Sequence, residues 1–93
     1  MTVTFHIPGA LRQFTGGRAR VEVNPAAATL GDALSALWTL YPALRDRIAT
    51  EQGVVREHIN LFVGEENSRF IGGVSAEVKA GTEISIISAA SGG

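Results

Sequence analysis

The residues that could do chemistry are few in this sequence, and the most distinctive of them stand at its end. An apolar run at residues 83–87 is followed by residues 88–93, which read Ser-Ala-Ala-Ser-Gly-Gly. A glycine pair inside a chain usually marks a turn, because glycine reaches positive φ without a steric penalty. Here no second strand follows the pair. The segment is therefore either a frayed terminus or the working part of the molecule.

Other reactive groups are missing or isolated. The sequence has no cysteine, which excludes disulfides, thiolate metal ligands and a cysteine nucleophile. His6 and His58 stand far apart and have no acidic or histidine neighbour at metal-ligand spacing. Glu65 and Glu66 are adjacent in a turn-like stretch, which predicts a solvated charge pair rather than an acid–base site. No phosphate-binding loop can be written around Lys79, the single lysine. We therefore predict a protein that is not an enzyme and that binds no metal or cofactor itself.

The C-terminal carboxylate remains as the candidate reactive group. An α-carboxyl group is an anion at neutral pH and a poor electrophile until another enzyme converts it into a mixed anhydride or thioester. Gly92 and Gly93 lack a Cβ atom, so they can pass along a narrow slot and bring the Gly93 carboxylate close to a nucleotide phosphate. Ala89, Ala90 and Ser91 are also small. We expect an activating enzyme to recognise them together with Gly92.

The bulk composition limits the classes of protein that remain. Ninety-three residues with 45% hydrophobic and 18% charged content predict one globular domain with one modest core. A net charge of -1, with arginines scattered along the chain, argues against nucleic-acid binding. No apolar run approaches the length of a membrane span, and the start of the sequence lacks an export signal. We expect a cytoplasmic location and no membrane partner.

Two alternating segments open the sequence. Apolar and polar residues alternate over residues 3–7, which predicts a half-buried strand with His6 on its surface face. A short connection and the turn signal Thr15-Gly16-Gly17 lead to a second alternating segment at residues 19–23. Together they predict a hairpin with a wide turn.

A helix is predicted to begin at Thr29, which can cap it, while Asp32 favours the positive end of the helix dipole. Its apolar residues recur at three- and four-residue steps and form one stripe: Leu30, Ala33, Leu34, Leu37, Tyr41 and Leu44. Pro42 ends this helix near Leu40, and residues 43–48 add a further helical turn. Trp38 is interpreted as packing at the edge of the core.

Three further strands complete the pattern. Residues 59–63 alternate, residues 69–71 predict a short strand, and residues 83–87 predict the last one. Residues 64–67 and the glycine pair at 72–73 are turn-like. This order of elements predicts an α+β domain over residues 1–87, in which the helix covers one face of a single sheet, followed by a flexible tail at 88–93.

One strand residue breaks the polar pattern of its face. Phe62 lies among polar neighbours in the segment 59–63. Either a nearby loop covers Phe62, or it is an exposed residue that docks a partner. Phe70 and Arg12 are the other candidate docking residues.

These features resemble the β-grasp sulfur carriers of the ThiS/MoaD family. The resemblance covers nearly the whole chain and is closest to the CysO type, which serves cysteine biosynthesis. It implies a ubiquitin-like fold with a mixed sheet of four to five strands and one main helix packed across it. The motifs that carry it are Ile7-Pro8, Leu11-Arg12, Thr15-Gly16-Gly17, Thr29-Leu30, Arg69-Phe70, Gly72-Gly73, residues 80–86 and Gly92-Gly93.

The resemblance also implies a reaction sequence. An E1-like enzyme of the MoeB/ThiF type uses ATP to adenylate Gly93, and sulfur then replaces AMP to give a Gly93 thiocarboxylate. In the CysO type a cysteine synthase takes the sulfur, and a metalloprotease releases the new cysteine from the carrier. Many molybdopterin-type members carry prolines before their last residues, whereas residues 88–91 have none.

Three alternatives stay open at this point. The chain can be a sulfur carrier for thiamin or molybdopterin, or a ubiquitin-like modifier that is joined to lysines of other proteins. It can also be a non-covalent β-grasp module that docks a partner through Phe62 and Phe70.

Overall fold

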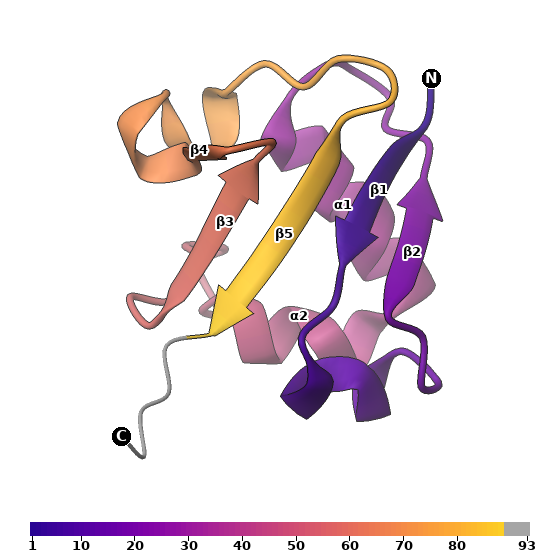
Figure 1. The fold of residues 1–93 in the computed structure, drawn as a ribbon. Helices are drawn as coiled ribbons and strands as arrows, with labels where there is room; N and C mark the ends of the chain where they lie inside the picture. The colour runs from indigo at the N-terminus through magenta and orange to yellow at the C-terminus, as the bar shows by residue number, and fades with distance from the viewer. Residues whose placement is uncertain (89–93) are drawn as a thin grey trace.

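The computed structural model describes residues 1–88. One layer is a five-stranded sheet with the strand order β2-β1-β5-β3-β4, and the other layer holds the two α-helices, which cover one face of the sheet (Figure 1). The predicted mixed β-grasp sheet with a main helix across it is confirmed. The strands are β1 (Val3–His6), β2 (Arg20–Val23), β3 (Ile59–Val63), β4 (Glu66–Asn67) and β5 (Glu83–Ser88). The helices are α1 (Leu30–Leu40) and α2 (Pro42–Ile48), with short 3-10 helices η1 (Gly9–Phe14), η2 (Ser68–Phe70) and η3 (Gly73–Ser75).

The first two strands form the predicted antiparallel hairpin. Phe5 pairs with Val21, and His6 pairs with Arg20. The wide connection between the strands contains η1 and ends in a turn. Within that turn the buried hydroxyl of Thr15 bonds the carbonyl oxygens of Arg12 and Arg18, at 3.2 and 2.8 Å, so the connection is held by its own polar groups.

The local signals of α1 act as predicted. The Thr29 side chain accepts a hydrogen bond from the backbone N–H of Asp32 at 3.2 Å and so satisfies one of the unpaired donors of the first turn. The helix ends at Leu40, and Pro42 occupies the first turn of α2, where a missing N–H costs nothing. Tyr41 is therefore the single residue between the two helices.

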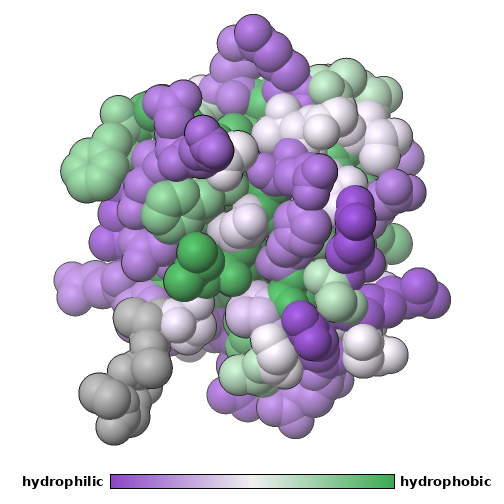
Figure 2. Space-filling model, viewed as in Figure 1, coloured by the Kyte–Doolittle hydropathy of each residue, from purple (hydrophilic) through white to green (hydrophobic). Residues whose placement is uncertain are grey.

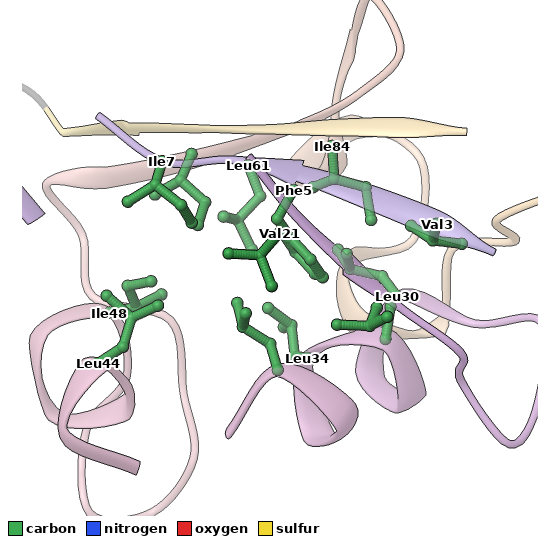
Figure 3. Packing of buried hydrophobic residues seen from close by; sticks show 14 of the residues in the cluster. Val3, Phe5, Ile7, Val21, Leu30, Leu34, Leu44, Ile48, Leu61 and Ile84 are labelled. Atoms are coloured by element: carbon green, nitrogen blue, oxygen red, sulfur yellow. The ribbon is translucent and has the colours of Figure 1, made fainter. Parts of the chain in front are cut away.

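The core lies between the sheet and the two helices. Figure 3 shows Phe5 and Val21 of the hairpin pointing toward Leu34 of α1, while Ile7 points toward the α2 residue Leu44. The predicted stripe is confirmed, since all of its α1 members are buried. Trp38 and Tyr41 pack against the edge of the core.

The expectation of a short strand at residues 69–71 was wrong. The outer neighbour of β3 is β4, in which Asn67 pairs with Phe62, so two residues that were expected to belong to a turn lie in the sheet. The chain then enters η2 because the Asn67 side chain accepts a hydrogen bond from the Arg69 N–H at 3.0 Å, and the Ile71 N–H bonds back to Ser68. These contacts curl residues 68–71 out of the extended conformation.

The last strand runs through the middle of the sheet. β5 pairs in parallel with β1 and antiparallel with β3, and in Figure 1 it crosses the centre of the sheet in yellow. The turn that feeds it places Gly81 at φ +83°, where its N–H donates to the Thr2 carbonyl at 2.7 Å. Only glycine adopts this region without strain. The final residue that the structure describes, Ser88, pairs with Ile59.

Candidate functional site

The candidate reactive residue and its neighbours follow directly after β5. Gly93, Gly92, Ser91, Ala90 and Ala89 lie outside the described residues, so their predicted roles stay predictions. The described part defines where this segment begins, because β5 is a central strand that keeps its pairing with β3 up to Ser88. Five extended residues span at most about 17 Å, which limits how far Gly93 can be from the end of β5.

The open face of the sheet adjoins this point. In β5, Ile84 and Ile86 are buried against the helices, so Ile87 points to the opposite, open face, where 47% of it remains exposed. Its partner across the strands is Asn60, two positions from Phe62 on the same face of β3. Figure 2 shows hydrophobic surface gathered on this face of the molecule. We call Phe62 and Ile87 the sheet-face patch.

Phe62, which the sequence suggested as a docking residue, is half-buried and belongs to this patch. Ile87, the more exposed member, was not predicted from the sequence. A signal for Ile87 was present. In the segment 83–87 apolar and polar residues alternate until Ile86, and strict alternation requires a polar residue at position 87. An isoleucine there places an apolar side chain on the solvent face, immediately before the tail.

The two other candidate docking residues lie on different 3-10 helices, Arg12 on η1 and Phe70 on η2. Because β1 and β5 are parallel, the chain leaves β1 at the same end at which β5 finishes, and η1 with Arg12 follows there (Figure 1). The Arg12 Nε donates to the Ile7 carbonyl at 3.0 Å, which fixes the first part of the side chain against the end of the hairpin. Phe70 lies in η2 and is 84% exposed.

Arg69, next to Phe70, has a structural role that the sequence did not indicate. Its Nη2 atom lies within hydrogen-bond distance of three backbone carbonyl oxygens: those of Arg56 at 3.1 Å, Glu57 at 3.0 Å and Ile59 at 2.8 Å. A guanidinium group can serve several acceptors because its donors are arranged in a planar fork. Arg69 thereby ties η2 to the loop before β3 and to the residue that pairs with Ser88.

The open sheet face also carries a pair of ionisable side chains. His6 of β1 and Glu83 of β5 form a hydrogen-bonded pair. The hydrogen bond from His6, and then its charge, hold the pKa of Glu83 below its usual value. The pair lies at the start of β5, so it is separated along that strand from the sheet-face patch near its end.

The described residues contain neither a metal-binding cluster nor a membrane-spanning helix. Within residues 1–88 no three histidine, aspartate or glutamate side chains gather closely enough to hold a metal ion. None of the helices in this part of the chain is long and apolar enough to cross a membrane. The features that the structure does offer near the tail are the end of β5, the sheet-face patch and the anchored Arg12.

Comparison with known proteins agrees with this arrangement. Residues 5–93 match the model of the ThiS family. The chain is 33% identical to the sulfur carrier protein CysO of Mycobacterium tuberculosis over the full length of both. It is 37% identical to the small archaeal modifier protein 1 of Haloferax volcanii, over 89% of this chain and 91% of the relative.

A solved structure extends the likeness to three dimensions. The structure superposes on a chain of the BexX/CysO complex from Amycolatopsis orientalis with a TM-score of 0.88 and 35% sequence identity, and the match covers 98% of this chain and 99% of that one. The resemblance inferred from the motifs is thus confirmed by sequence and by fold. The chain belongs to the ThiS family and is a ubiquitin-like protein of the sulfur-carrier type.

Proposed function

We propose that this protein carries sulfur as a thiocarboxylate on Gly93 and that the sulfur serves cysteine biosynthesis. The observation that carries the proposal is the full-length similarity to CysO, within a family match that continues through residue 93. The geometry of the described residues supports it, because β5 is held in the middle of the sheet up to Ser88 and the chain continues from there to Gly93.

The chemistry requires two enzyme-catalysed steps at one carbon atom. The Gly93 carboxylate first attacks the α-phosphorus of ATP, which forms an acyl adenylate and releases pyrophosphate. A hydrosulfide ion then attacks the acyl carbon, AMP leaves and the sulfur loses its proton to solvent, so the carbonyl carbon keeps a sulfur in place of one oxygen. We assign the first step to an E1-like enzyme of the MoeB/ThiF type, since ATP is used by that enzyme and not by this chain. A cysteine synthase then transfers the sulfur to an activated serine, which leaves a new cysteine attached to the carrier. A metalloprotease hydrolyses this cysteine from the carrier.

The sheet-face patch is the surface that we assign to docking of these enzymes. Ile87 is the next-to-last residue of β5, so a protein that contacts Ile87 and Phe62 is within reach of the tail. Arg12 adds a fixed cation at the same end of the sheet. Exposed apolar residues rimmed by polar ones are typical of such contact surfaces.

The test is an intact-mass measurement. The purified protein is incubated with ATP, the host's activating enzyme and a sulfur source, and we expect its mass to rise by the difference between sulfur and oxygen. A chain whose Gly93 carboxylate has been converted to an amide is the control and should not react. No mass increase with any activating enzyme of the host contradicts the proposal.

The docking surface is tested by a matched pair of variants. Ile87→Glu and Val74→Glu change side chains of nearly equal exposure, 47% and 49%, on different parts of the molecule. We expect Ile87→Glu to slow thiocarboxylate formation and Val74→Glu to leave its rate unchanged. Equal rates for the two variants contradict the assignment of the patch.

A second candidate function is conjugation to other proteins. It is favoured by the 37% identity to the small archaeal modifier protein 1. Conjugation shares the adenylation step, so the distinguishing measurement is a Gly-Gly remnant on lysines of other proteins after proteolysis. Self-linked chains through a lysine side chain require Lys79, which is exposed.

A further inference from the structure

A pocket lies between the loop before β3, the 3-10 helices η2 and η3, and the start of α1. Its volume is about 300 Å³, at the lower end of the range of small-molecule sites. Its lining includes the buried side chains of Leu30, Ile59 and Ser68. Val54 and Val74, which also line it, are 62% and 49% exposed. The pocket is therefore closed on one side by the core and open to solvent on the other.

Hydrogen bonds hold the segments around the pocket in place. The Leu30 N–H donates to the Ala76 carbonyl at 2.9 Å, which joins the start of α1 to the residue after η3. The Thr50 N–H donates to the Val54 carbonyl at 2.8 Å, and the Val54 N–H donates to the Thr50 hydroxyl at 3.2 Å. Arg69 ties η2 to the loop before β3 through its three carbonyl contacts. A ligand thus meets a site that is formed before binding, which reduces the entropy lost when it binds.

Two polar side chains stand among the apolar ones. Ser68 is only 6% exposed, and its hydroxyl takes part in none of the side-chain hydrogen bonds found within residues 1–88. No fully buried side-chain oxygen of these residues lacks a partner, so the Ser68 hydroxyl is accessible from the pocket that Ser68 lines. Arg69 is the only charged lining residue, and it forms no ion pair with another described residue. Only its Nη2 atom contacts the carbonyls, which leaves the Nε and Nη1 donors available within the described part of the chain.

This combination of groups selects an amphipathic anion. Apolar side chains make up most of the lining, and none of the lining residues is acidic. The Ser68 hydroxyl and the Arg69 guanidinium supply hydrogen-bond donors and one positive charge, and a carboxylate has two oxygen atoms that accept from such donors. An ammonium group would instead lie beside the cation of Arg69 and is disfavoured there.

We infer that this pocket binds a small aliphatic carboxylate. The aliphatic chain lies against Leu30 and Val74. The carboxylate accepts hydrogen bonds from the Ser68 hydroxyl and from Nε or Nη1 of Arg69. Because Arg69 is exposed, water weakens the attraction between the charges, and burial of the chain supplies most of the affinity. This interaction is independent of the sulfur chemistry proposed for Gly93.

The experiment uses three probes with the same eight-carbon chain: octanoate, octanamide and octylammonium. Amide resonances of the ¹⁵N-labelled protein are followed by NMR at neutral pH during titration. We expect saturable shifts centred on residues 53–55, 68–69 and 73–74 with octanoate. Octanamide, which lacks the charge, should bind about two- to fivefold more weakly, the range of one exposed ion pair, and octylammonium should bind more weakly still.

A series of shorter acids tests the apolar contact. From butanoate to hexanoate to octanoate the affinity should rise by up to about fourfold for each added methylene group, the value for complete burial of one CH₂. The chemical shifts should move at the same residues for all three acids. Equal affinity across the series contradicts the inference, because a bare surface cation binds all carboxylates alike.

Variants test the polar and apolar sides of the pocket separately. Ser68→Ala should weaken octanoate binding about two- to tenfold, the range of one hydrogen bond, without a fall in Tm. Val54→Glu places a carboxylate at the open side and should weaken octanoate binding while octylammonium binding becomes stronger. Leu40→Glu, at a residue that is 54% exposed at the end of α1, is the matched control and should change neither. The charge of Arg69 is tested through the ligands, because its replacement also removes the anchor of the loop before β3.

Several results overturn the inference. They are shifts centred elsewhere on the protein, equal affinity for octanoate and octylammonium, equal effects of Val54→Glu and Leu40→Glu, or no saturable binding. Deletion of Gly92 and Gly93 should leave octanoate binding unchanged. Octanoate binding that appears only after this deletion also overturns the inference, because the occupant is then the tail of this chain. Val74→Glu should weaken octanoate binding but not thiocarboxylate formation, so failure here and failure of the Gly93 chemistry are separate outcomes.

Discussion

Replacement of Arg69 by alanine tests how the end of the sheet that carries the tail is held in place. The Nη2 atom of Arg69 carries two N–H groups and faces three carbonyl oxygens, at 2.8, 3.0 and 3.1 Å, so the N–H groups can support about two full hydrogen bonds. Hydrogen bonds to a charged donor contribute about 1.5–3 kcal/mol each, but the residue as a whole is exposed and water competes. We therefore use about 1 kcal/mol per bond, at the centre of the range for ordinary hydrogen bonds.

Arg69→Ala should lower the free energy of unfolding by about 2 kcal/mol. For a domain of this size such a loss corresponds to a fall in Tm on the order of 10 °C. Urea unfolding can be followed through Trp38, the single tryptophan, which packs against the core. Arg69→Lys should recover little of the loss, because an ammonium group has no planar fork of donors.

Arg18→Ala, at an exposed arginine before β2, is the matched control and should change stability by less than about 0.5 kcal/mol. Hydrogen exchange should show faster opening at residues 56–59 in Arg69→Ala, because the loop before β3 loses its anchor. If Arg69→Ala and Arg18→Ala unfold at the same urea concentration, the hydrogen bonds of Arg69 do not stabilise the fold and the reasoning is refuted.

Three further predictions concern the core, one turn and one surface pair. Leu37 of α1 is fully buried, so Leu37→Ala should lower the free energy of unfolding in urea by about 2–5 kcal/mol. Thiocarboxylate formation by the folded fraction should be unchanged. An unaltered unfolding curve contradicts this prediction. Gly81→Ala should lower the free energy of unfolding by about 1–2 kcal/mol, because φ is +83° there although an added Cβ meets no atom within 4 Å. The control is Gly9→Ala, where φ is not positive and the space is equally open, so stability should not change. Equal melting temperatures of the two variants refute this prediction. The pKa of Glu83 is lowered in the folded protein, so its stabilising effect is present above its usual pKa of 4.5 and disappears as the pH falls through the lowered value. The stability difference between the wild type and Glu83→Gln should therefore shrink as the pH falls below about 4.5, and a difference that grows on acidification below that pH has the wrong sign.

Most local structure of this protein could be predicted from the sequence. The alternation at residues 3–7, the cap at Thr29 and the break at Pro42 each depend on near neighbours in the chain, and all three are confirmed. The strand expected at residues 69–71 failed because the Asn67 side chain competes for the backbone N–H of Arg69. Apolar content predicted an extended segment there, whereas the Asn67 side-chain bond and the backbone bond from Ile71 to Ser68 form a 3-10 helix.

The sequence by itself determined which faces of the main helix and of the alternating strands are buried, where the main helix lies and that the glycine pair follows the last strand, because these depend on short-range periodicity and on residue type. The tertiary structure decided the rest. Insertion of β5 between β1 and β3 brings residues near the two ends of the sequence together, places Arg12 at the end of the sheet where β5 finishes, and sets Ile87 beside the strand of Phe62. It also leaves β2 as an open edge beside α1. Strand order depends on pairing between segments that are distant in the chain, and local sequence patterns do not indicate which segments pair.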